Sequence, residues 1–394
     1  MTGPQRYDLL LAGGRVIDPR NALDGTCDVA IRDGRIAAVA ASLDRASADS
    51  VRDVSGLIVA PGLIDIHTHV YHKATSYGVD PWPLSQRSAL TTLVDAGSAG
   101  AGNFAGLRDF VIGASRTRIL AYLNISFPGI FAFERGMMVG EAAIRALLSV
   151  DRCVAAAEAN RDLVVGVKVR IGGGVSGEIG IEALDRAVDA AGKLGLPLMT
   201  HIGRPPPAYA EILARLRPGD ILTHCFRPAP NAPVDDAGRI LPALLAARER
   251  GVLFDIGHGM GAFGFASAEA AVACGFLPDM ISSDAHVLSI DGPAYDLLHT
   301  MSKLVHCGIT PADAIRMTTD VPARALRRPD LGHLGIGAIA DISLLKLAPA
   351  RFPFVDAAGD MRTGASLWRS AGTYLAGQSV DPAPRPWEAN YLDA

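Results

Sequence analysis

The middle of the chain repeats one pattern, in which a short run of strand-forming residues is usually followed by a helical stretch. Two helical stretches, residues 181–195 and 237–251, carry apolar side chains at spacings of three and four and stop at glycine. Eight such units predict a (β/α)₈ TIM barrel, an α/β fold whose active sites lie at the carboxyl ends of the strands. The predicted strands are residues 63–70, 91–97, 119–126, 164–171, 197–203, 220–226, 252–259 and 280–286.

The two ends of the chain predict β-structure of another kind. Residues 7–60 combine short strands with tight turns, including the hairpin signal "RDG" at 32–34, and residues 332–346 again show glycine turns and an apolar strand. We therefore predict a small β-sandwich domain built from residues 1–60 and 332–394, which flanks a barrel of residues 61–331. After residue 350 the sequence predicts an irregular tail.

Composition excludes several classes of function. The formal net charge is −4 and no lysine or arginine run occurs, so a nucleic-acid surface is not expected and a small-molecule partner is. No stretch reaches the roughly 18 to 20 apolar residues of a membrane span, and the first residues show no export signal. The five cysteines are far apart and form no C-x-x-C pair, which predicts reduced thiols and a cytoplasmic location.

Metal-type side chains gather near the ends of the predicted barrel strands. They are His67, His69, His201, His224 and Asp284. Because His67 and His69 are two residues apart on a strand, their rings point to the same side. Each histidine alone is more simply read as structural, but five such side chains at one edge of a barrel favour a metal site.

The predicted strand 164–171, "VVGVKVRI", carries two charges on one face. Alternation places Val165, Val167, Val169 and Ile171 on the other face. A buried ammonium needs a partner or a chemical modification. Reaction of Lys168 with carbon dioxide to form a carbamate makes it a bidentate anion that could bridge two divalent ions. His67, His69 and Asp284 would then hold one ion and His201 and His224 the other, in a nitrogen and oxygen shell suited to Zn²⁺.

Five ordered motifs resemble those of the amidohydrolase superfamily. They are "PGLIDIHTHV" (61–70), "KVR" (168–170), "THIG" (200–203), "THCF" (223–226) and "SSDAH" (282–286). The resemblance implies a hydroxide that bridges two metal ions and attacks a polarised carbonyl, with Asp284 as ligand, base and acid. It also implies a homo-oligomer, because barrels of this superfamily often pair.

Four further residues are predicted to contact the substrate. Arg170 shares the face of the bridging lysine, nearer the mouth of the site, where it could bind a substrate carboxylate; an ion pair with a loop acid such as Glu178 is the alternative. His258 and Tyr71 follow predicted strands at the same edge, although a tyrosine there often only packs. His286 could contact the substrate or brace the catalytic aspartate.

The motifs distinguish between reactions within the superfamily. A dihydroorotase resembles this chain in general organisation, but typical dihydroorotases have an arginine where this chain has Tyr71. Lys168 counts against the deaminases, which usually lack it. "FDIGHG" (254–259) and "GPAYDLLHTMSKL" (292–304) resemble a branch called dihydroorotase-like or deacetylase, with "SSDAH" replacing its common "STDLH".

That branch implies cleavage of acetylated α-hydroxy carboxylates such as acetyl-mandelate. A cyclic amide hydrolase of the dihydroorotase or dihydropyrimidinase type and an N-acyl amino acid deacetylase remain as alternatives, since the same site serves both. A non-catalytic scaffold is a further alternative, against which the complete ligand set counts.

Overall fold

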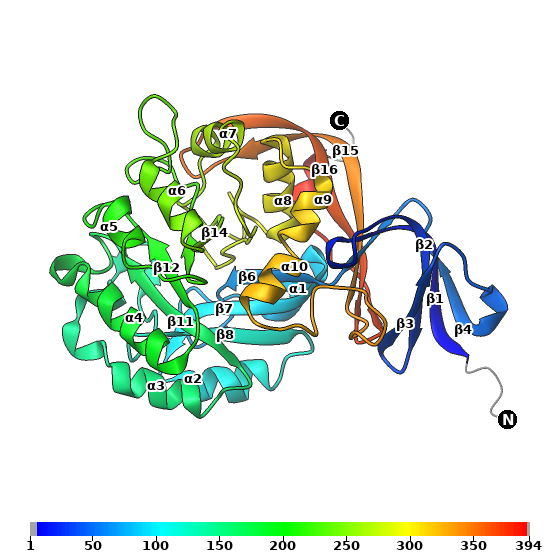
Figure 1. Ribbon diagram of the computed structural model, residues 1–394, viewed down its shortest axis with the longest axis horizontal. Helices are drawn as coiled ribbons and strands as arrows, with labels where there is room; N and C mark the ends of the chain where they lie inside the picture. Colours follow the sequence, from blue (N-terminus) through cyan, green and yellow to red (C-terminus); the bar gives the residue numbers. More distant parts are fainter. Residues whose placement is uncertain (1–5, 392–394) are drawn as a thin grey trace.

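Seven parallel strands form one sheet in the larger part of the protein, seen here as a computed structural model that describes residues 6–391 (Figure 1). Each strand pairs in parallel with the next one along the chain. The strands are β6 (Leu63–Thr68), β7 (Leu90–Gly100), β8 (Arg118–Asn124), β11 (Val164–Ile171), β12 (Leu198–Ile202), β13 (Ile221–Thr223) and β14 (Leu253–Asp255). They coincide with the first seven predicted strands, so the TIM-like parallel sheet is confirmed.

The eighth predicted strand, 280–286, makes isolated bridges instead. Met280 pairs in parallel with Asp255 at one edge of the sheet, and Ala285 pairs in parallel with Thr68 at the other. The segment therefore connects β14 to β6, as the last barrel unit should. It does not continue as a strand, because Asp284 adopts a φ of 48°, which extended backbone does not allow.

A bulge in β11 determines the face of the sheet on which Val165 lies. Pairing with β8 shifts register between Val164 and Gly166. Val167 and Val169 accordingly pack among the residues of the surrounding helices, whereas Val165 joins a separate apolar cluster inside the sheet, with Ile66 among its members. The prediction that Val165 shares a face with the other valines is therefore wrong, because a bulge inserts one residue into the alternation.

Helices cover the outside of the parallel sheet (Figure 1). They are α1 (Pro81–Ser88), α2 (Phe104–Gly106), α3 (Val150–Glu158), α4 (Glu182–Leu194), α5 (Tyr209–Leu213), α6 (Pro242–Glu249), α7 (Phe265–Ala273), α8 (Leu297–His306), α9 (Pro311–Arg316) and α10 (Asp320–Ala325). Helix α4 lies within its predicted range and ends before Gly195, whose φ is 63°. Helix α6 begins later than predicted, because Pro242 suits the first helical position.

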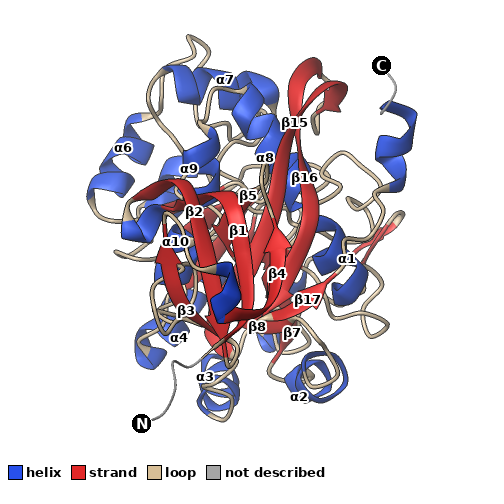
Figure 2. Ribbon diagram, turned by 90° about the vertical axis from the view of Figure 1, so that its right-hand side faces the viewer, coloured by secondary structure: helices blue, strands red, loops and turns tan. Residues whose placement is uncertain are grey.

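Strands from both ends of the chain form a second, mixed sheet (Figure 2). They are β1 (Tyr7–Asp18), β2 (Leu23–Arg32), β3 (Arg35–Ala40), β4 (Ala48–Asp53), β5 (Ile58–Pro61), β15 (Ile342–Val355), β16 (Met361–Leu375) and β17 (Gln378–Val380). The shared sheet is confirmed, and Asp33 and Gly34, with φ of 52° and 70°, make the predicted turn. One sheet replaces the predicted sandwich because β5 pairs with both β1 and β15, which joins all the strands.

Residues 342–375 are ordered as a long hairpin, so the prediction of an irregular tail is wrong up to β17 and holds only for residues 381–391. Pro349 and Pro353 disfavour a strand in the sequence, but β15 pairs with β5 only up to Leu345 and is free on that edge beyond it. The hairpin of β15 and β16 reaches across the barrel helices (Figure 1). The Trp368 amide of β16 donates to Ser302 Oγ of α8 at 2.9 Å.

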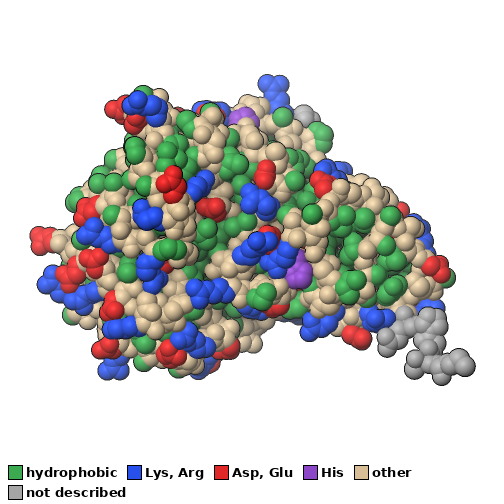
Figure 3. Space-filling view, viewed as in Figure 1, with side chains coloured by type: hydrophobic (Ala, Val, Ile, Leu, Met, Phe, Trp, Pro, Cys, Tyr) green, Lys and Arg blue, Asp and Glu red, His purple; other side chains and the backbone are tan. Residues whose placement is uncertain are grey.

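Among residues 6–391, no helix is both long and apolar enough to cross a bilayer. Acidic and basic side chains are interspersed over the face shown in Figure 3. Such mixing of both charge signs is ordinary for a protein surface.

Candidate metal centre and active site

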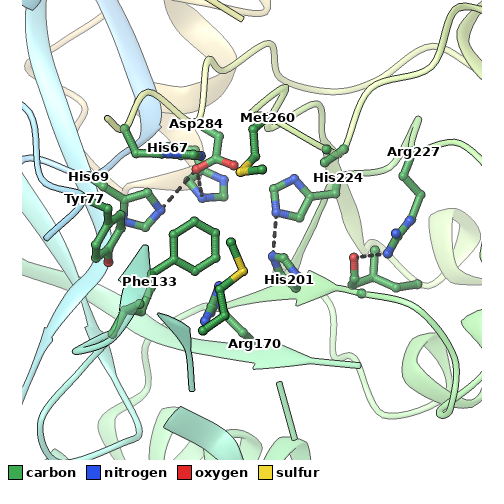
Figure 4. Close-up of a pocket in the computed structure, with 17 residues that line it drawn as sticks. His67, His69, Tyr77, Phe133, Arg170, His201, His224, Arg227, Met260 and Asp284 are labelled. Carbon is green, nitrogen blue, oxygen red and sulfur yellow. Dashed lines mark hydrogen bonds and ion pairs between the residues drawn. The ribbon is translucent and has the colours of Figure 1, made fainter. Parts of the chain in front are cut away.

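Metal-type side chains converge in one cavity at the carboxyl ends of the parallel strands (Figure 4). The cavity measures about 230 Å³. Its lining includes His67, His69, His201, His224 and Asp284. These five were expected at strand ends, and the barrel brings them together from β6, β12, β13 and the segment that follows β14. Lys168 is fully buried beside them.

The polar atoms of these side chains form two neighbouring groups. Asp284 Oδ1 lies 3.3 Å from His67 Nε2 and 3.1 Å from His69 Nε2. His224 Nε2 lies 2.7 Å from His201 Nδ1. The two groups are adjacent, because ligand atoms of His67, His224 and Asp284 all lie within 4.8 Å of one another. This trio is a candidate metal site.

Lys168 lies beside the first group of ligands. Its Nζ is 3.3 Å from His67 Nε2, and its side chain is fully buried. Burial lowers the pKa of the amine to about 8, which leaves part of it uncharged at neutral pH. Gly97 makes room for the lysine stem, because a Cβ there would lie 2.6 Å from Lys168 Cβ.

A hydroxyl and a buried carboxylate determine which ring nitrogen of His67 carries the proton. Burial raises the pKa of Asp255 to about 6, so this carboxylate is still ionised at neutral pH and only accepts hydrogen bonds. Thr223 Oγ1 donates to Asp255 Oδ2 at 2.7 Å. The hydroxyl therefore accepts from His67 Nδ1, 2.9 Å away. This leaves the His67 Nε2 lone pair facing the cavity, as metal binding requires.

A hydroxyl bound to a carboxylate also orients a second histidine, His69, and a backbone carbonyl orients a third, His224. Ser98 Oγ donates to Asp95 Oδ2 at 2.7 Å and lies 3.0 Å from His69 Nδ1, from which it accepts. His224 Nδ1 donates to the Gly257 carbonyl at 2.6 Å. Burial lowers the pKa of both His69 and His224 to about 3, so the rings are neutral at physiological pH. Neutral imidazoles held in this way are suited to bind a metal.

Strained backbone and close-packed glycine hold the ligands in place. His224 and Asp284 adopt φ values of 70° and 48°, which are uncommon outside glycine and are typical of functional sites. A Cβ on Gly259 would lie 2.2 Å from Asp284 Oδ2, and one on Gly257 would lie 2.3 Å from Thr223 Oγ1. Only glycine lets this loop approach the site so closely, which explains the glycines of the sequence "FDIGHG".

Arg170 reaches the cavity but is already paired. Its Nε and Nη2 each donate to a carboxylate oxygen of Glu141 at 2.7 Å, and both side chains are buried. The guanidinium also lies over the Phe133 ring, 5.0 Å from its centroid. The alternative prediction of an ion pair is therefore the one that the structure supports, with Glu141 as the partner. Glu178, the acid named from the sequence, is exposed.

Two of the other predicted substrate contacts lie outside the cavity lining. His258 is fully buried, its ring stacks on Phe263 at 4.7 Å, and its Nε2 lies 2.8 Å from Lys303 Nζ. The Tyr71 hydroxyl donates to the Asn103 carbonyl at 3.0 Å, because packing turns it away from the cavity. Both residues thus make contacts within the protein and neither lines the cavity, and their substrate contacts stay predictions.

His286 does line the cavity, together with residues that the sequence analysis missed. The missed residues include Tyr77, Phe133, Met138, Arg227 and Met260. Phe133 and Met138 come from a short hairpin of β9 (Phe133–Glu134) and β10 (Met137–Met138). All five residues lie in loops or in this short hairpin and belong to none of the recognised motifs, so no strand period or spacing indicated them.

Replacing Thr223 with valine is expected to weaken metal binding about 10- to 100-fold, because it removes the acceptor that orients His67. Equilibrium dialysis against a chelator of known affinity measures this effect. Thr200→Val is the matched control, since the buried Thr200 hydroxyl of β12 has no hydrogen-bond partner. Equal weakening in both variants would show that His67 does not depend on the Thr223 hydroxyl.

Comparison with known proteins agrees with this architecture. The chain is 36% identical over 344 residues to deacetylase Atu3266 of Agrobacterium fabrum, covering 87% of this chain and 84% of that protein. It is 33% identical over 378 residues to a deacetylase of Enterococcus faecalis, covering 95% and 99% of the two chains. Residues 260–368 match the model of the amidohydrolase family.

Solved structures show the same relationship. A structure described as an adenine deaminase superposes with a TM-score of 0.88 at 33% identity, covering 95% of this chain and all (100%) of the other. A structure described as a dihydroorotase gives a TM-score of 0.87 at 32% identity, covering 95% and 99%. These names describe different reactions, but the identity and coverage agree on ancestry, and the chain belongs to the amidohydrolase superfamily.

Proposed function

We propose that this chain is a metal-dependent deacetylase that cleaves the acyl ester of an α-hydroxy carboxylate, with acetyl-mandelate as the type of substrate. The observation that carries the proposal is the convergence of neutral, oriented histidines and Asp284 in one cavity. The deacetylases of Agrobacterium fabrum and Enterococcus faecalis, similar over most of this chain, support the reaction class.

The donors present fit a pair of divalent metal ions. His67, His69 and Asp284 would hold one ion and His201 and His224 the other, and a carbamate formed on Lys168 would supply a further anionic ligand. Neutral imidazole and carboxylate donors suit Zn²⁺. Bound metal ions would supply a water activated at neutral pH and would polarise the scissile carbonyl.

Asp284 is the proton carrier of the proposed reaction. Its Oδ1 faces His67 and His69, while Oδ2 makes no hydrogen bond within residues 6–391. Oδ2 can accept the proton of the attacking water and return it to the departing ester oxygen, which yields acetate and the α-hydroxy acid. Tyr77, Phe133 and Met260 give the cavity an apolar wall against which a phenyl group can pack.

The alternatives share these residues and differ in the bond that is cleaved. A cyclic amide hydrolase and an N-acyl amino acid deacetylase would use the same metal ligands and the same aspartate. The absence of a dihydroorotase-type arginine at Tyr71 disfavours the first. The retained Lys168 disfavours a deaminase.

A substrate panel tests the proposal. Protein purified with Zn²⁺ and bicarbonate should hydrolyse one enantiomer of O-acetylmandelate with a kcat/KM of about 10⁴ M⁻¹ s⁻¹ or more. N-acetylphenylglycine and dihydroorotate should react more slowly. Faster cleavage of the N-acetyl compound would identify an N-acyl amino acid deacetylase, and faster opening of dihydroorotate would identify a cyclic amide hydrolase. A protein that binds no metal and cleaves none of them would not be a hydrolase.

A further inference from the structure

Arg227 is a buried arginine at the cavity wall that no acid of the described chain neutralises. Only 8% of its surface is exposed, and it lines the cavity. Its Nη1 donates to the Ile202 carbonyl at 2.6 Å, while its Nε is buried without a hydrogen-bond partner. Among residues 6–391, no ion pair involves this guanidinium.

The other arginine of the cavity shows what such a group normally requires. Arg170 uses Nε and Nη2, the side edge of its guanidinium, to bind both oxygens of Glu141. In Arg227 the corresponding edge has no acceptor among the described residues. A buried charge that no acid compensates is unfavourable, so an anion that binds beside Arg227 would stabilise the arrangement.

No acidic side chain of the described cavity wall pairs with Arg227. Asp284 is the single acid among the described residues that line the cavity, and its Oδ1 faces His67 and His69. Figure 4 shows Arg227 on the far side of His224 from those two histidines. A ligand that spans the cavity would thus have an acidic proton carrier at one end and an uncompensated cation at the other.

We propose that Arg227, and not Arg170, binds the carboxylate of the substrate. The assignment rests on the proposed deacetylation for the identity of the substrate. A carboxylate in the cavity would accept a charge-assisted hydrogen bond from Nη2, which neither bonds to Ile202 nor is buried as Nε is. Anchored at Arg227, an α-acyloxy carboxylate extends its ester back toward His224 and Asp284, where the reaction is proposed to occur. Arg170 then serves to hold Glu141 and the wall formed by Phe133.

The experiment compares O-acetylmandelate with benzyl acetate, which has the same acyl group and phenyl ring but no carboxylate. Arg227→Met should lower the selectivity for O-acetylmandelate over benzyl acetate by about 100-fold, mainly through KM. Arg227→Lys should recover part of that loss. Arg204→Met, the control, removes an exposed neighbouring arginine and should change the selectivity less than about threefold. A collapse of selectivity in Arg170→Met but not in Arg227→Met would overturn the assignment.

Calorimetric binding of mandelate separates this proposal from the proposed function. If the wild type cleaves neither ester, the deacetylase proposal fails, but loss of mandelate binding in Arg227→Met alone would still support the anion site. Equal binding of mandelate to the wild type and Arg227→Met would overturn it. Absence of mandelate binding to the metal-loaded wild type would overturn it as well. Circular dichroism of each variant establishes that the fold is retained.

Discussion

Asp284→Asn is expected to lower kcat by about 10³-fold while leaving the fold unchanged. The amide has the shape of the carboxylate, but it cannot accept a proton from water or return one to the leaving oxygen, and general acid–base groups contribute on this scale. Initial rates with O-acetylmandelate measure the effect. Thermal unfolding of the metal-free protein should differ little from the wild type, because the amide has the same shape and can still face His67 and His69.

The control for this substitution is Asp291→Asn, which removes the charge of an exposed aspartate nearby in the sequence. It should retain the wild-type rate. A fall in kcat of less than about tenfold in Asp284→Asn would show that another group transfers the proton. Metal analysis of the same samples is needed, since Asp284 also belongs to the candidate metal site and its loss could lower the metal content.

Lys168→Ala is expected to reduce the bound metal from two equivalents to one or fewer and to lower activity by about 10³-fold. In the proposed centre the carbamate of Lys168 is the ligand common to both ions, so its removal separates the two histidine groups. Elemental analysis of dialysed protein measures the metal content. Short carboxylates such as propionate should restore part of the activity, because they can enter the space left by the lysine and supply a bidentate anion.

Lys193→Ala is the control for this experiment, because Lys193 is an exposed lysine on α4. It should bind metal as the wild type does. Unchanged metal content and activity in Lys168→Ala would rule out a bridging role. Loss of activity without rescue by any carboxylate, together with a lowered melting temperature, would instead indicate that the buried lysine has a structural role.

The metal-type residues could be predicted because regular structure determines where they lie. Strand alternation directs His67 and His69 to one side, and the ends of parallel barrel strands meet at one edge. Those rules need no knowledge of loops. They failed locally at β11, where the bulge near Val165 changes the alternation, and at Asp284, whose φ of 48° interrupts the eighth strand.

The substrate contacts could not be predicted in the same way, because they depend on loop conformation. Tyr71 and Tyr77 lie in one loop, and only its folded path decides that Tyr77 lines the cavity. Arg170 pairs with Glu141, which begins a 3-10 helix of three residues in the connection between β10 and α3, where no sequence signal predicted it. Arg227 follows β13 closely, but nothing in the sequence indicates that no acid would pair with it.

The buried contacts of Lys303 determine when the loop beside the site can be anchored during protein synthesis. The buried Lys303 Nζ lies 2.8 Å from His258 Nε2, 2.7 Å from the Pro293 carbonyl and 2.6 Å from the Val355 carbonyl of β15. The loop that carries Gly257 and Gly259 against the ligands is thus held, through His258 and Lys303, by β15. During translation the barrel strands leave the ribosome before β15 does. This anchor can form only when β15 has followed them, so a chain that stops before β15 has a metal-type site without it.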